Sequence, residues 1–182
     1  IESLVSIKAF GVGGGGSNAV SRMAADASPS VEYIAVNTDA QALIKTAAPT
    51  KLRIGDQLTR GLGAGGDPEV GNQAAEESRE DIYEVVKGSD MVFIAAGMGG
   101  GTGTGAAPTI AQIAKETGAL TIGIVTKPFA FEGQRRARQA EEGIARMHDA
   151  VDSLIVIPNE KLLEVAGMEA SWKDAFGLAD DI

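Results

Sequence analysis

Cysteine is absent from all 182 residues of the sequence, and histidine occurs once, as His148. The absence of cysteine excludes disulfide bonds and thiolate zinc sites, and it is typical of proteins in a reducing compartment. No Ser-His-Asp pattern and no metal-ligand spacing surrounds His148. We therefore expect neither a catalytic triad nor a metal site that uses this side chain.

Positive charge is scarce as well, because 16 lysines and arginines stand against 25 aspartates and glutamates, for a net charge of −9. Proteins that bind nucleic acid present a basic face to its phosphate backbone. The one basic cluster, formed by Arg135, Arg136 and Arg138, is too small for such a face. The composition therefore predicts no nucleic-acid partner.

Long apolar runs are also missing. No stretch approaches the roughly 20 residues that a membrane-spanning helix requires, and the first residues lack the charged start and apolar centre of a signal peptide. The sequence thus predicts a soluble, cytoplasmic protein without direct membrane insertion. Because it begins with Ile1 and stops at Ile182 inside a helical pattern, we also expect an excised domain.

Glycine, in contrast, is abundant, with 24 residues, and it separates short β-branched runs from longer amphipathic ones. This alternation predicts an α/β fold with a doubly wound, mainly parallel sheet and helices on both faces. Ligands of such sheets bind at the carboxyl ends of the strands, where the glycine loops of this chain lie. The expected strands are residues 4–10, 31–36, 51–54, 91–96, 120–126 and 153–157; the expected helices are residues 18–27, 68–87, 106–117, 133–150, 160–166 and 171 onward. Asp67 is expected to cap the helix at 68–87.

The most informative glycine loop is the run GMGGGTGTG at residues 97–105, between an apolar strand and a helix. Glycine lets the backbone approach a phosphate closely. The unpaired N–H groups in the first turn of the following helix attract negative charge. Thr102 and Thr104 add hydroxyl donors. This loop therefore predicts a phosphate site.

Two further glycine loops, residues 11–18 and 61–66, follow the same logic. The first satisfies G-x-G-x-x-G, and Asp39 lies near the place of an acidic residue that reads a ribose, so a dinucleotide-binding oxidoreductase is a serious alternative. Three such loops nevertheless favour a longer polyphosphate than a pyrophosphate bridge. The P-loop motif G-x-x-x-x-G-K-[ST] is absent, so backbone dipoles must hold the phosphates.

Three other sets of residues are ambiguous from their chemistry alone. Glu132 and Arg136 are four residues apart, which suits either a surface ion pair or contacts to a sugar. Asn159, at a strand end, suits either a turn or a hydrogen bond to a base. Phe176 and Asp180 suit either a core aromatic and a solvated carboxylate or a pair that stacks on a purine and accepts its N–H donors.

The order of the motifs resolves these alternatives by resemblance. The loop at 11–18 is followed by VNTDAQAL (36–43), GLGAGGDPEVG (61–71), DMVFIAAGMGGGTGTGAAP (90–108), VTKPFAFEG (125–133) and the Ile-Pro-Asn turn at 157–159. This series resembles the FtsZ family, the bacterial and plastid homologues of tubulin, over essentially the entire chain. The resemblance implies a GTPase of the cell-division ring that assembles head-to-tail into filaments.

It also implies which residues bind GTP or GDP, with Mg²⁺ held through the phosphates and water and without direct side-chain ligation. Residues 1–182 would form the GTP-binding domain, ending inside the core helix, with the second domain absent from this chain. The implied residues are Gly14, Gly15, Gly16, Ser17 and Asn18 at the α- and β-phosphates, Asp39 near the phosphates, Ala64, Gly65 and Gly66 at the γ-phosphate, Gly97, Gly99, Gly100, Gly101, Thr102, Gly103 and Thr104 around the phosphates, Pro128, Glu132 and Arg136 toward the ribose, and Asn159, Phe176 and Asp180 at the guanine.

The resemblance further implies that hydrolysis is completed by an acidic loop of the adjacent subunit, which these 182 residues do not include. We therefore expect no complete catalytic set, and slow hydrolysis by the chain alone. The implied partners are further copies of the protein and other division proteins. The implied location of the full-length protein is the cytoplasmic division site, and a plastid stroma is equally compatible.

Overall fold

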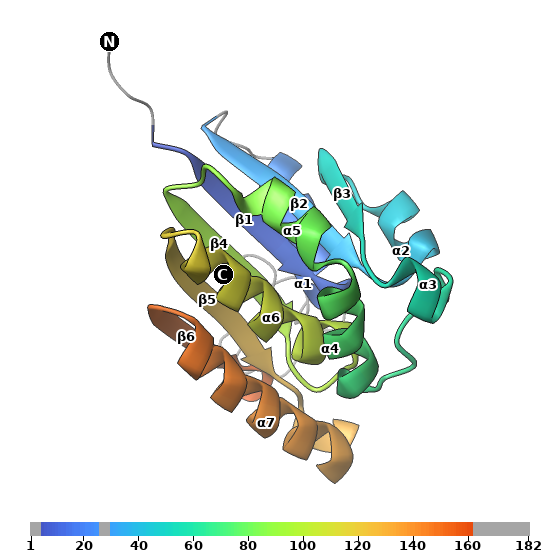
Figure 1. The fold of residues 1–182 in the computed structure, drawn as a ribbon. Coiled ribbons are helices and arrows are strands. Elements are labelled where there is room, and N and C mark those ends of the chain that lie inside the picture. The colour runs from blue at the N-terminus through green and yellow to red at the C-terminus, as the bar shows by residue number, and fades with distance from the viewer. Residues whose placement is uncertain (1–4, 26–29, 162–182) are drawn as a thin grey trace.

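A single parallel sheet organises the fold of the computed structural model, which describes residues 5–25 and 30–161 (Figure 1). Its strand order is β3-β2-β1-β4-β5-β6, and all neighbouring strands are parallel. The predicted doubly wound parallel sheet is therefore confirmed. The strands are β1 Ile7–Val12, β2 Val31–Asn37, β3 Thr50–Arg53, β4 Met91–Gly97, β5 Leu120–Lys127 and β6 Ser153–Pro158.

Helices lie on both faces of the sheet, as expected, but unequally in the part of the chain described. Four helices cover one face and appear in front of the sheet in Figure 1, whereas α1 packs on the opposite face with the short helix α2. The first set is α4 Pro68–Glu77, α5 Arg79–Val86, α6 Thr102–Glu116 and α7 Gln134–Ala150; the others are α1 Gly13–Ala25, α2 Ala40–Lys45 and the short segments α3 Asp56–Thr59 and η1 Ala130–Glu132.

The apolar character of the strands follows from this double cover. Phe10, Val12 and Ile94 are fully or almost fully buried against the four-helix face. Ala9 and Ala35 are buried with Val20 of α1 on the other face. A strand that is covered on both sides has no solvent face, so it shows no polar alternation. Burial therefore holds the carboxyl ends of the strands in a fixed arrangement.

The prediction of one helix over residues 68–87 is wrong, because the segment forms two helices, α4 and α5, that are separated at Ser78. The Ser78 hydroxyl accepts a hydrogen bond from the distant Gly55 N–H at 2.9 Å, in a buried position. The neighbouring Glu77 carboxylate accepts from the first-turn amides of α3. These partners lie about 20 residues away in sequence, so no local signal such as glycine or proline marks the break.

Two helices begin earlier than predicted, and the reason is the same for both. Helix α1 starts at Gly13 instead of residue 18, and α6 starts at Thr102 instead of residue 106. Glycine has a low intrinsic helix propensity, which argued for loops, but packing against the sheet draws these glycines into the first helical turns. The predicted helix start at Asp67 is confirmed, because its carboxylate accepts from the Glu69 N–H at 3.0 Å. The short helices α2 and α3 were not predicted. The helix predicted to begin at residue 133 begins at Gln134. Residues 162–182, which include the last two predicted helices in whole or in part, lie outside the described part.

Helices α4 and α6 pack backbone against backbone. A Cβ atom on Gly105 of α6 would overlap the carbonyl oxygen of Pro68, and one on Gly71 of α4 would overlap the carbonyl oxygen of Gly101. Both glycines therefore permit an approach that no side chain allows. This contact places the start of α4, and the glycine loop before it, beside the start of α6.

We predict that Gly105→Ala lowers the free energy of unfolding by about 1–3 kcal/mol, because its methyl group must force α4 away from α6. Gln112→Ala, on the exposed side of the same helix, is the matched control and should change stability by about 0.5 kcal/mol or less. Urea unfolding followed by circular dichroism measures both. Equal stability of the two variants would contradict the close packing of α4 on α6.

Candidate functional site

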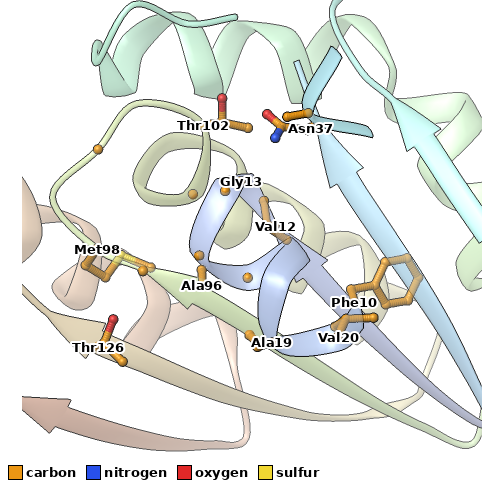
Figure 2. A pocket seen from close by; sticks show the side chains of 18 of the residues that line it. Phe10, Val12, Gly13, Ala19, Val20, Asn37, Ala96, Met98, Thr102 and Thr126 are labelled. Atoms are coloured by element: carbon orange, nitrogen blue, oxygen red, sulfur yellow. The ribbon is translucent and has the colours of Figure 1, made fainter. Parts of the chain in front are cut away.

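A cavity of about 770 Å³ extends from the carboxyl ends of the central strands along the face that α1 covers, as far as Ile7 and Val31. At this point β1 leads into α1 on one face, whereas its neighbour β4 leads into α6 on the other face. Connections that leave in opposite directions open a crevice, which is where doubly wound sheets bind ligands. Figure 2 shows Gly13 within this cavity, with Asn37 and Thr102 toward one side and Met98 and Thr126 toward the other.

The three glycine loops of the sequence meet here, and they touch through their backbones. A Cβ atom on Gly13 would lie 2.9 Å from the Gly103 amide nitrogen. This contact joins the first loop, residues 11–18, to the main loop, residues 97–105. A Cβ atom on Gly101 would lie 2.8 Å from the Asp67 amide nitrogen and 2.9 Å from the Ala64 Cβ, which joins the main loop to the third. The loops form one wall made almost entirely of main chain.

This wall attracts anions through two helix N-termini. Helices α1 and α6 both begin at the cavity, and no side chain caps α6 at Gly101. The first amide groups of an α-helix have no partner within the helix, and the helix dipole adds partial positive charge there. Arg136 is the one cationic side chain among the described residues that line the cavity. Main-chain N–H groups are therefore the main donors available to an anionic ligand.

Asp39 lines the cavity at the end of β2 and caps helix α2. Its Oδ1 accepts hydrogen bonds from the amides of Gln41, at 2.9 Å, and Ala42, at 3.2 Å. The cap orients the carboxylate with a structural role of its own.

Glu132 and Arg136 form an ion pair at 3.0 Å, with side-chain exposures of 18% and 52%. They do not share one helix, because Glu132 ends η1 and Arg136 lies in the first turns of α7. Glu132 also accepts from the Phe129 N–H through its second oxygen, at 2.6 Å. Each carboxylate oxygen keeps a lone pair, so the ion pair and a contact to a sugar hydroxyl are compatible.

Asn159 follows β6 at the far side of the cavity, and it is only 6% exposed. Its Oδ1 is buried and accepts no hydrogen bond from any residue that the structure describes. A buried acceptor without a partner destabilises a fold by about 1–3 kcal/mol unless a ligand or water satisfies it. This oxygen marks the place at which a ligand N–H is expected.

Most residues assigned by resemblance line this one cavity. Ser17 and Asn18 do not: the Ser17 hydroxyl lies 3.5 Å from the Gly11 carbonyl oxygen, away from the cavity. Gly99 and Thr104 do not line it either, since the Gly99 N–H donates to the Thr104 hydroxyl at 2.8 Å and closes the loop internally. Phe176 and Asp180 lie outside the described residues. Those that line it are Gly14, Gly15, Gly16, Asp39, Ala64, Gly65, Gly66, Gly97, Gly100, Gly101, Thr102, Gly103, Pro128, Glu132, Arg136 and Asn159.

The sequence analysis missed Gly13, Asn37 and Thr38, all of which line the cavity. Gly13 has a φ of +77°, the left-handed conformation that turns the chain from β1 into α1. Asn37 accepts from the amide of Thr38 at 2.8 Å and stabilises the turn after β2. Their signal was available, because they belong to the first glycine loop and to the strand end that contains Asp39.

The described residues provide neither a cluster of metal ligands nor a membrane-spanning helix. No group of three or more His, Cys, Asp or Glu side chains in this part of the chain could hold a metal ion. Within the same residues, no helix combines the length and apolarity needed to cross a membrane.

Comparisons with known proteins agree with the geometry. The Tubulin/FtsZ family, GTPase domain, matches residues 6–167. Over 98% of its length the chain is 48% identical to FtsZ of M. jannaschii, solved as an empty dimer, with a TM-score of 0.94; it covers 52% of that chain. The W319Y mutant of the same FtsZ is similar, with 49% identity and a TM-score of 0.91. The match covers 96% of this chain and 52% of the other.

A more distant similarity concerns the fold alone. CetZ2 of Haloferax volcanii, solved as a GTPγS-bound protofilament, is 22% identical, with a TM-score of 0.87 over 97% of this chain and 55% of that one. The chain thus spans about half the length of the solved relatives that it matches. None of these similarities supports the dinucleotide-dependent oxidoreductase alternative.

The contact between the main loop and the third loop predicts a difference between two adjacent glycines. Gly101→Ala should lower the free energy of unfolding by about 1–3 kcal/mol, because the added methyl group meets the backbone of Asp67 and the Ala64 side chain. Gly100→Ala is the control, since no atom lies within 4 Å of a Cβ there, and it should be neutral within about 1 kcal/mol. Thermal unfolding without ligand measures both. A neutral Gly101→Ala would show that the loops do not touch.

Proposed function

We propose, from the premise that the chain belongs to the Tubulin/FtsZ family through its GTPase domain, that it binds GTP and GDP in the cavity at the carboxyl ends of β1 and β4. The observation that carries this proposal is the convergence of three glycine loops on the N-terminus of α6. Main-chain amides in this number suit a nucleotide with several phosphates.

The phosphates would lie along the glycine wall. The start of α1 and Gly14–Gly16 would take the α- and β-phosphates, whereas Ala64, Gly65 and Gly66 would approach the γ-phosphate. The exposed Gly14 has no atom within 4 Å of a Cβ position, so its backbone is open to a ligand. Ser17 and Asn18 would support the site only as part of α1, because neither residue is part of the cavity lining.

The nucleoside would lie toward β5 and β6. Glu132 would accept from ribose hydroxyls, with its orientation held by Phe129 and Arg136. The Oδ1 of Asn159, which has no partner among the described residues, would accept an N–H of guanine. Phe176 and Asp180, which lie beyond the described residues, would stack on the base and accept its remaining donors.

A magnesium ion fits this arrangement only through the ligand. Asp39 is the one carboxylate on the phosphate side of the lining, and its Oδ1 already caps α2. We propose that Mg²⁺ is held by the phosphates and water, with Asp39 facing the hydrated ion. A bound ion would neutralise phosphate charge in a chain whose own net charge is −9.

We further propose that the whole protein is a cell-division GTPase that assembles head-to-tail into filaments through the nucleotide face, at a cytoplasmic division site. One solved relative is an FtsZ dimer. Hydrolysis would need an acidic loop of the adjacent subunit, to position the attacking water. These 182 residues alone should therefore bind nucleotide and hydrolyse it slowly. Other division proteins would be partners of the whole protein.

The first experiment compares GTP, GDP, ATP and NAD in thermal unfolding, with phosphate release measured on the same sample with and without Mg²⁺. A ligand that binds the folded state raises stability by RT ln(1 + [L]/Kd), about 2.7 kcal/mol at a concentration 100 times Kd. We expect stabilisation by GTP and GDP only, without appreciable turnover. Stabilisation by NAD alone would overturn the proposal, and rapid turnover would overturn the role given to the neighbouring subunit.

A second prediction concerns base selection. Asn159→Ala should lower the preference for GTP over ATP by about 1 kcal/mol, because it removes a neutral hydrogen-bond acceptor. Its stability without nucleotide should not fall through the loss of a hydrogen bond at Oδ1, because this oxygen has no partner among the described residues. Isothermal titration with both nucleotides tests this, with Gln112→Ala as the control. An unchanged preference would remove Asn159 from the base site.

A further inference from the structure

Thr38 lies in the turn after β2, between two of the three glycine loops, those at residues 61–66 and 97–105. Its hydroxyl oxygen is 2.7 Å from the hydroxyl oxygen of Thr102, the first residue of α6. Its carbonyl oxygen lies 3.3 Å from the Thr59 hydroxyl, just before the loop that holds Ala64–Gly66, and the same hydroxyl lies 3.2 Å from the Gly55 carbonyl oxygen. The neighbouring Ala40 N–H donates to the Gly61 carbonyl at 3.1 Å. The turn after β2 is thereby tied to both other loops.

The two hydroxyls differ in their exposure, and so in their access to a ligand in the cavity. Thr38 is fully buried, whereas Thr102 is 9% exposed, and both belong to the cavity lining. Each hydroxyl carries one proton, and in this pair either oxygen can be the donor. An anion beside Thr102 selects one direction. If Thr102 gives its proton to a phosphate oxygen, the hydrogen bond within the pair must run from the Thr38 hydroxyl to Thr102 Oγ1.

We propose that Thr38 is a positioning residue of the phosphate site: it donates to Thr102 Oγ1 and so orients the Thr102 hydroxyl toward the bound phosphates. This inference rests on the proposed nucleotide binding. The hydrogen bonds run in one direction, from Thr38 to Thr102 to the phosphate, so each polarises the next. No proton is transferred. The pair also fixes the rotamer of Thr102 before the ligand arrives, which reduces the ordering required on binding.

The alternative is a purely structural bond that holds the turn after β2 against α6. The two roles differ in what they affect. A structural bond contributes to stability with or without nucleotide. A positioning bond contributes to nucleotide affinity, and it does so only while Thr102 keeps its hydroxyl.

The test uses three variants of the 182-residue chain. Thr38→Val keeps the volume and removes the hydroxyl, and Thr38→Ser keeps the hydroxyl. Thr121→Val is the matched control, because Thr121 is also fully buried, at the opposite end of the sheet, and donates to the Ala119 carbonyl at 3.1 Å. Thermal unfolding without ligand measures stability, and isothermal titration with GTP and GDP measures affinity.

We expect Thr38→Val to weaken GTP and GDP binding about three- to tenfold, the change that corresponds to one net hydrogen bond. Thr38→Ser should restore most of the affinity. Thr121→Val should lower the melting temperature and leave the affinity unchanged. A loss of stability in Thr38→Val with wild-type affinity would overturn the proposal in favour of the structural role.

A double-mutant cycle with Thr102→Val sharpens the result. If Thr38 acts through Thr102, the effect of Thr38→Val on affinity disappears in the Thr102→Val background. Equal effects in both backgrounds would overturn the proposed path through Thr102. Failure of the wild-type chain to bind any guanine nucleotide would refute the proposed function itself, a result distinct from wild-type binding with no effect of Thr38→Val.

Discussion

The contact of backbone with backbone among the three glycine loops is the constraint on which the site depends. Gly13 meets Gly103, and Gly101 meets Asp67 and Ala64, at distances that no side chain would permit. The same principle acts between two helices on one face of the sheet, where Gly71 and Gly105 let α4 and α6 touch. Because these contacts leave no room for Cβ atoms, the wall of the cavity presents amide groups instead of side chains.

This constraint explains how a chain with a net charge of −9 would hold the polyphosphate that we propose as its ligand. Lysine and arginine do not form the anion site, since Arg136 alone among the described lining residues is cationic, and it is paired with Glu132. Partial charges at the starts of α1 and α6 take their place. They require no side-chain ordering, and the buried sheet holds them in position.

The polar residues around the wall serve both the fold and the site. Asp39 caps α2, Glu132 joins η1 to α7, and Thr38 connects the turn after β2 to the start of α6. Asn159 is the exception, because its buried oxygen is left without a partner by the described residues. A group that is satisfied by the fold is orientated before the ligand binds, whereas one without a partner among the described residues is open to a ligand donor. The cavity thus combines preorganised donors and acceptors with one acceptor, Asn159 Oδ1, that has no partner among the described residues.

The sequence by itself determined the fold class, the presence of the six strands and the three glycine loops, because burial on both faces makes the strands apolar and because glycine runs between strand and helix have a local cause. The bounds of the first strand were wrong, since β1 spans Ile7–Val12 instead of residues 4–10. It also determined the cap at Asp67, which needs only neighbouring amides. Only the tertiary structure decided that α4 and α5 separate at Ser78, that glycines 13–16 are helical, and that Thr104 closes its own loop whereas Thr102 reaches Thr38. The partners in these cases are either distant in sequence or set by packing against the sheet. Hydrogen bonds between remote segments leave no periodic or compositional trace, so they become visible only when the chain is folded.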